Sequence, residues 1–98
     1  MNKQIIITRK DLPTPDQDTL SQIHQLGRTV KNKIVCGANS KEHLMNALTI
    51  ASELNLNQDI DVHVFGESCI VFVELSEENA ARVLDAYDVM QGFSTGRL

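Results

Sequence analysis

The stretch Asp59-Ile60-Asp61-Val62-His63-Val64-Phe65-Gly66-Glu67-Ser68-Cys69-Ile70-Val71-Phe72-Val73-Glu74-Leu75 decides the fold. Its two apolar runs are rich in β-branched and aromatic residues, which favour strands. They are separated by a short turn that begins with glycine, and a two-residue turn with glycine first is a common hairpin connection. The stretch therefore predicts an antiparallel hairpin.

The predicted turn also sets the register of the hairpin. Val62 then faces Val71 and Val64 faces Cys69, so one face of the hairpin is entirely apolar. A one-residue slip would mix His63 into that face, and the pattern therefore favours the unslipped pairing. The opposite face would carry His63, Phe65, Ile70 and Phe72.

Before the hairpin, the chain reads as two strand-helix units. Lys3 to Thr8 is a β-branched run and predicts a buried first strand. Thr14 as N-cap predicts a helix over about 15–26, which ends at Gly27. Residues 28–32 fit either a continued helix or a strand, whereas Lys33 to Cys36 predicts a strand.

Two further helices are predicted from their capping residues. Asn39 with Glu42 three residues later predicts the start of a helix that ends near Asn55. Ser76, followed by two acidic residues, predicts a last helix that closes at Gly92. Its buried stripe would contain Ala80, Val83, Leu84, Tyr87 and Met90.

The resulting order of elements is β-α-β-α-β-β-α. Strand-helix-strand units imply parallel neighbours with right-handed crossovers, and the hairpin adds an antiparallel pair. We therefore expect an α/β protein, an α+β sandwich in which three helices pack on a four-stranded mixed sheet. The length of 98 residues fits one compact domain over 1–93 with a loose tail over 94–98.

The composition argues for a cytoplasmic protein with no membrane segment. No apolar run approaches the 18 to 20 or so residues that span a bilayer, and the apolar start is too short for a secretory signal. Cys36 and Cys69 each lie in or beside an apolar run, so both are expected to be free, buried thiols in a reducing compartment.

Catalytic and metal-binding patterns are weak in this sequence. The three histidines lack metal-ligand spacing, and no cofactor-binding motif is present, so no metal and no cofactor are predicted. Cys36 precedes a helix start, which can activate a thiol, but Glu42 stands six residues later where a phosphate-binding loop would place an arginine. We therefore expect a structural Cys36 and a protein that is not an enzyme.

The charge pattern argues against nucleic-acid binding and leaves an acidic surface. The net charge is −4, and the basic residues near Arg28 have no interleaved aromatics. The acidic side chains of the last helix, which solvation alone explains, form a second candidate surface for a basic partner: Glu77, Glu78, Asp85 and Asp88.

Two interpretations of the His63, Phe65, Ile70 and Phe72 face stay open. If every helix covers the other face, this patch is exposed and marks a partner or self-association surface. If the first helix covers it, the patch is a second core layer.

The leading hypothesis is a small protein-binding adaptor, regulator or inhibitor that acts by surface complementarity, with a homodimer as one form. A mobile-element-encoded inhibitor of a host protein fits the same features. The alternatives are a small-ligand sensor that binds between subunits and a thiol enzyme using Cys36.

Overall fold

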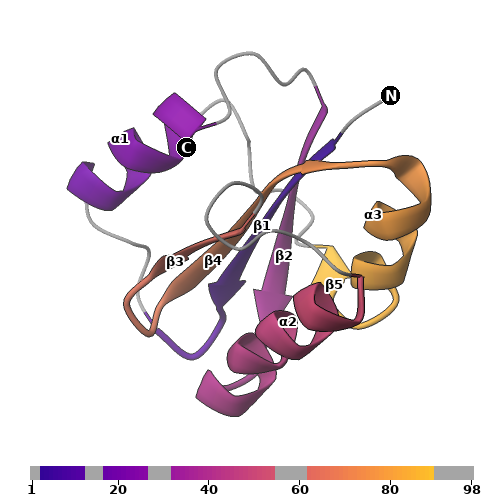
Figure 1. The fold of residues 1–98 in the computed structure, drawn as a ribbon. Coiled ribbons are helices and arrows are strands. Elements are labelled where there is room, and N and C mark those ends of the chain that lie inside the picture. Colours follow the sequence, from indigo (N-terminus) through magenta and orange to yellow (C-terminus); the bar gives the residue numbers. More distant parts are fainter. Residues whose placement is uncertain (1–2, 13–16, 27–31, 55–61, 90–98) are drawn as a thin grey trace.

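The computed structural model describes residues 3–12, 17–26, 32–54 and 62–89 (Figure 1). The elements in chain order are β1 (Lys3–Arg9), α1 (Gln17–Leu26), β2 (Asn32–Ala38), α2 (Lys41–Glu53), β3 (Val62–Phe65), β4 (Cys69–Leu75), α3 (Glu77–Leu84) and β5 (Asp88–Val89). The tail predicted for 94–98 lies outside the described residues, and the single domain over 1–93 stays a prediction.

The strands form one mixed sheet in the order β3-β4-β1-β2-β5. β1 pairs with β2 in parallel, whereas β4 is antiparallel to both β1 and β3, and β5 is antiparallel to β2. The mixed sheet with three helices is as predicted. The strand number is not, because the described residues form five strands rather than four.

The additional strand arises because α3 ends earlier than expected. It ends at Leu84 rather than near Gly92, so Tyr87 does not belong to a helical stripe. Instead the Tyr87 hydroxyl donates a hydrogen bond of 2.6 Å to the carbonyl oxygen of His43 on α2. The chain then continues as β5, with Val89 opposite Cys36 and Asp88 opposite Gly37.

Helices cover both faces of the sheet, and two core layers result (Figure 1). α2 and α3 pack on the face that carries Ile5 and Ile7, whereas α1 packs on the face that carries Ile6. All three isoleucines are fully buried, because β1 lies in the middle of the sheet between the two layers. The smaller layer contains Ile6, Ile23, Val35, Cys69 and Val71.

The hairpin register differs by one residue from the predicted one. The turn itself forms as expected, since Ser68 N–H donates to the Phe65 carbonyl at 3.3 Å and Gly66 has φ 59°. However, the Ser68 carbonyl accepts the N–H of Arg9 on β1 at 3.2 Å. Ser68 is therefore an extra residue beside the ladder, and the first hairpin pair is Phe65 with Cys69.

This shift exchanges the two faces of β3 relative to those of β4. Val62 now lies opposite Phe72, and Val64 lies opposite Ile70. Phe72 is fully buried in the layer under α2 and α3, whereas Val64 is 46% exposed. The predicted division of the hairpin into a Val62, Val64, Val71 core face and an opposite patch is therefore wrong.

The helix starts are confirmed for α3 and displaced by one residue for α2. Ser76 Oγ accepts the N–H of Asn79 at 3.3 Å and caps α3. Ser40, not Asn39, caps α2, with its Oγ accepting the His43 N–H at 3.1 Å.

α1 begins at Gln17, and the Thr14 cap lies outside the described residues. The strand over Lys33 to Cys36 is confirmed, and of the open stretch 28–32 only Asn32 is described, as the start of β2.

The observed register predicts opposite sensitivities at Val64 and Phe72. Phe72→Ala empties a fully buried position and is expected to lower the free energy of unfolding by about 3 to 5 kcal/mol. Val64→Ala removes a side chain that is already half exposed and is expected to cost less than about 1 kcal/mol. Urea denaturation followed by circular dichroism measures both. A larger loss at Val64 than at Phe72 would restore the unshifted register.

Candidate functional site

The structure divides the four residues that the sequence placed in one binding patch. Ile70 and Phe72 are fully buried beneath α2 and α3. His63 and Phe65 lie on the other face of the sheet, beside α1, and both are partly exposed. A single patch made of all four residues is therefore not formed, because two of them belong to the larger core layer.

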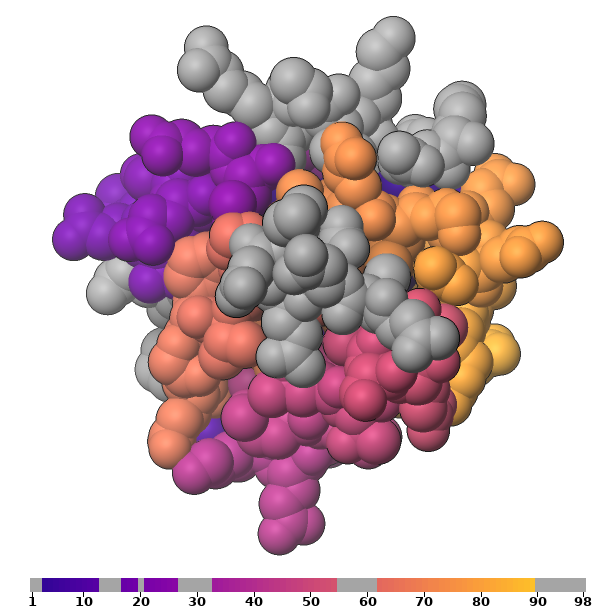
Figure 2. Space-filling model, viewed as in Figure 1, coloured from indigo at the N-terminus to yellow at the C-terminus, as the bar shows by residue number. Residues whose placement is uncertain are grey.

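His63 and Phe65 line a groove that the sequence did not predict. The groove has a volume of about 280 Å³ and runs between α1 and β3. Figure 2 shows the surface of α1, in purple, adjoining that of the hairpin, in salmon. We call it the α1–β3 groove, and it is lined by Gln22, Gln25, Leu26, His63 and Phe65.

Among the described residues, the lining of the α1–β3 groove combines apolar side chains with polar ones and includes no Lys, Arg, Asp or Glu. Leu26 and Phe65 pack against the smaller core layer and provide an apolar floor. Gln22 and Gln25 are exposed, and each amide offers both donors and acceptors. The groove is suited to an apolar side chain that is flanked by hydrogen-bonding groups.

Sequence reasoning missed the contribution of α1 to this groove. A right-handed crossover from β1 to β2 places α1 on one face of the sheet, but it does not fix how far the helix reaches towards β3. Gln22 and Gln25 are ordinary exposed helical residues with no local signal of a site. Only the tertiary arrangement brings them next to His63 and Phe65.

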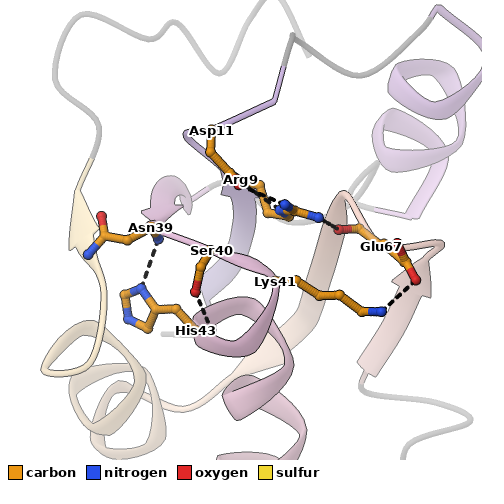
Figure 3. A network of polar contacts seen from close by, with 7 residues as sticks. All are labelled: Arg9, Asp11, Asn39, Ser40, Lys41, His43 and Glu67. Carbon is orange, nitrogen blue, oxygen red and sulfur yellow. Dashed lines mark hydrogen bonds and ion pairs between the residues drawn. The ribbon is translucent and has the colours of Figure 1, made fainter.

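A second candidate place is the edge where β1 and β2 end. α1 and α2 follow these neighbouring parallel strands and lie on opposite faces of the sheet, which is the arrangement that creates a ligand crevice in open α/β folds. Figure 3 shows the polar groups at this edge. We call Arg9, Asp11, Lys41 and Glu67 the strand-end cluster.

The cations of the strand-end cluster are already paired with acids. Arg9 binds both carboxylate oxygens of Asp11, at 3.0 and 2.7 Å, and Lys41 Nζ lies 2.7 Å from Glu67 Oε1. The hydrogen bond from Arg9 lowers the pKa of Asp11, and the one from Lys41 lowers the pKa of Glu67. Because these exposed pairs neutralise one another, the cluster has little net charge to attract an anionic ligand.

Beside this cluster, His43 holds α2 against the segment that follows α3. Its Nδ1 accepts the Asn39 N–H at 2.9 Å, which leaves Nε2 as the protonated nitrogen that donates to the Ala86 carbonyl at 2.9 Å. The imidazole also stacks on Tyr87, with 4.5 Å between ring centroids and 18° between planes. These contacts give His43 a structural role at the junction of α2 with the segment that follows α3.

Both cysteines are free and buried, as predicted. Burial, with a smaller effect of Asp88, raises the pKa of Cys36 to about 11, and burial raises the pKa of Cys69 to about 12. A catalytic thiol needs the opposite shift, because the thiolate is the nucleophile. Neither cysteine has the environment of an activated thiol.

The four residues of the predicted acidic surface are all exposed. Glu77 and Glu78 lie in the first turn of α3, where they complement the positive end of the helix dipole. Asp88 lies 3.7 Å from Lys10 Nζ, and Arg82 on α3 binds Glu53 on α2. The surface is therefore mixed in sign, and a role in binding a basic partner stays a prediction.

In the part of the chain that the structure describes, no group of three or more His, Cys, Asp or Glu side chains could hold a metal ion. No helix among the described residues is both long and apolar enough to cross a membrane.

No protein-family model matches the chain, and no curated protein or solved structure matches it.

The raised thiol pKa values predict slow cysteine chemistry with a defined pH dependence. At neutral pH both thiols should be protonated and react with a thiol-specific reagent far more slowly than cysteines in the denatured chain. Above about pH 9, where unfolded cysteines ionise, the free energy of unfolding should fall as the pH rises towards 11, because the folded state disfavours the thiolate. The Cys36→Ala, Cys69→Ala variant should lack the part of this fall between about pH 9 and 10, because Tyr87, whose pKa burial raises to about 12, adds its own fall only above about pH 10. Fast labelling of native Cys36 at neutral pH would contradict the structural assignment.

The contact between Tyr87 and His43 predicts a measurable contribution to stability. Tyr87→Phe removes the hydroxyl and its 2.6 Å hydrogen bond but leaves the aromatic stack, so a loss of about 0.5 to 1.5 kcal/mol is expected. His43→Ala removes two hydrogen bonds and the stack and should cost more. Thermal and urea unfolding measure the difference. Equal stability of Tyr87→Phe and the wild type would show that the hydrogen bond contributes nothing.

Proposed function

We propose that the protein is a small non-catalytic protein-binding domain, an adaptor, regulator or inhibitor, and that a protein partner binds at the α1–β3 groove. The observation that carries the proposal is the groove itself, which joins an apolar floor from two elements to a polar rim with Gln22 and Gln25. Apolar centres with polar rims are typical of protein interfaces. The exposed Val64 on the same strand extends the apolar surface to the other side of β3.

The size of the groove favours a protein partner over an enclosed small ligand. Small-molecule pockets usually hold about 300 to 1,000 Å³ and bury most of the ligand. The α1–β3 groove, with about 280 Å³, lies just below this range. A single apolar or aromatic side chain of a partner fits such a space, and such anchors commonly dominate interface energy.

Another hollow, along α2, supports a site less well. It is larger, at about 590 Å³, but all of its described lining residues belong to α2 or its cap: Ser40, Glu42, His43, Met45, Asn46 and Thr49. The α1–β3 groove is formed by two elements that come from distant parts of the chain. A surface formed by two elements gives a partner more shape to recognise.

The thiol chemistry supports the non-catalytic part of the proposal. The buried Cys36 with its raised pKa is a poor nucleophile at neutral pH.

The small-ligand alternative would need a second subunit to enclose the α1–β3 groove. A metabolite that raised the melting temperature of the purified protein in a saturable manner would favour that alternative.

The test is affinity capture from the native host with a variant that changes only the rim of the groove. Gln22→Arg, Gln25→Arg places two cations at exposed helical positions of the α1–β3 groove, so the fold should be retained. We expect this variant to lose at least about tenfold of the captured partner, as measured by mass spectrometry and then by titration with the purified partner.

A matched control keeps the charge change and moves it to another surface. Asn46→Arg, Thr49→Arg also alters two exposed residues three positions apart on a helix, but on α2. This control should capture the partner as the wild type does. If the control loses the partner and the α1 variant keeps it, the binding surface is the α2 flank and not the α1–β3 groove.

A further inference from the structure

β3 is the terminal strand of the sheet on one side. Among the described strands it pairs only with β4, so its other side faces no described strand. An edge strand presents N–H and C=O groups that can pair with another chain, and proteins usually protect such edges with charged residues, prolines or coverage. The residues of β3 decide whether this edge is protected.

Within its own described residues, β3 lacks the charges and prolines that usually protect an edge strand. Its four residues, Val62, His63, Val64 and Phe65, include no Lys, Arg, Asp, Glu or Pro. The strand at the other end of the sheet differs, because β5 has two residues and its Asp88 forms an ion pair with Lys10. The β3 edge is therefore the better candidate for strand pairing.

The sequence of β3 is complementary to itself when two copies run antiparallel about a two-fold axis. Residues that face each other in such a pair share one side of the sheet, so the axis must pass through a residue position. With the axis at Val64, Val64 faces Val64 of the second copy, and His63 faces Phe65. With the axis at His63, two histidines would face each other. Val64 would then face Val62, which is only 4% exposed.

The register centred on Val64 would cover the exposed side chains on both faces of β3. On the side of α2 and α3, the two half-exposed Val64 side chains cover each other. On the side of α1, Phe65 of each copy comes beside His63 of the other, and both residues line the α1–β3 groove. Aromatic cross-strand pairs of this kind stabilise a sheet by about 0.2 to 1 kcal/mol each.

The charges of the chain are compatible with this contact. Each copy has a net charge of −4, which opposes association over most of the surface. The β3 edge carries none of the acidic side chains, and Glu67 in the adjoining turn is neutralised by Lys41 at 2.7 Å. Two copies can therefore meet at β3 without bringing unpaired described carboxylates into the strand contact.

We propose that a second copy of this chain is a partner of the β3 surface, and that the two β3 strands pair antiparallel with Val64 opposite Val64. The sheet then continues from one copy into the other, and the two α1–β3 grooves adjoin across the axis. This inference rests on the proposed function, because it names one occupant of the same protein-binding surface.

Site-directed crosslinking tests the register. Residues that face each other in an antiparallel pair have Cα atoms about 4.5 to 5.5 Å apart, which suits a disulfide. Val64→Cys should form a covalent dimer on mild oxidation, and Val89→Cys, the matched exposed valine on β5, should not. Both variants are made with Cys36→Ala, because Cys36 lies opposite Val89 and would otherwise form a disulfide with Val89→Cys within one chain. The other native cysteine, Cys69, is buried and does not compete. A covalent dimer of Val89→Cys without one of Val64→Cys would overturn the proposal.

Light scattering tests the association without crosslinking. The wild type should have twice the 10.9 kDa mass of the chain, and Val64→Lys, at a half-exposed position, should scatter as a folded monomer. Val89→Lys should stay dimeric. A wild type that is monomeric at every soluble concentration would overturn the homodimer.

The two proposals fail separately. If the wild type is monomeric but the Gln22→Arg, Gln25→Arg variant loses its captured partner, the homodimer is wrong and the protein-binding function stands. If the wild type is a dimer that Val64→Lys dissociates, while capture from the host does not depend on the glutamines, the homodimer stands and the host partner binds elsewhere.

Discussion

The structure depends on the burial of β1 on both faces. Ile5 and Ile7 point into the layer beneath α2 and α3, Ile6 points into the layer beneath α1, and none of the three is exposed. Burying three such side chains contributes about 5 to 9 kcal/mol, the same order as the net stability of a small domain. Gln4 on the same strand lowers the free energy of unfolding, because its buried Nε2 has no hydrogen-bond partner among the described residues. β1 can occupy this position only because helices cover both sides of the sheet.

The same double burial explains why the sequence predicted the hairpin but not its register. Alternation selects a register only when one face of a strand is polar. The first four residues of β4, from Cys69 to Phe72, are all buried, so either register would place an apolar side chain at each of these positions. The deciding contact was the hydrogen bond from Arg9 N–H to the Ser68 carbonyl, which joins residues far apart in the sequence. The glycine at position 66 predicted the position of the turn correctly, but turn residues carry no information about the pairing of the hairpin with β1.

Local signals also explain which helix boundaries could be predicted. Ser76 caps α3 through its own hydroxyl, and a capping serine before two acids is readable from the sequence. The end of α3 was not readable, because Ala80, Val83 and Tyr87 keep helical spacing. The contact of Tyr87 with His43, 44 residues away, shows that the residue packs against α2 after the helix has ended. The strand β5 follows from that contact and has no signal of its own in two residues.

The candidate site follows from the coverage of the sheet. With α1 on one face and α2 and α3 on the other, the sheet offers a partner its two outer strands and the grooves beside them rather than an open face. At one end, β5 is short and Asp88 is held by Lys10. At the other, the four residues of β3 include no Lys, Arg, Asp or Glu, and a groove lies between β3 and α1 among the described residues. The sequence placed His63 and Phe65 opposite the expected core of the hairpin, but it grouped them with Ile70 and Phe72 because of the register. The one-residue shift therefore moves the expected surface from a face of the sheet to its edge, where backbone groups as well as side chains can bind.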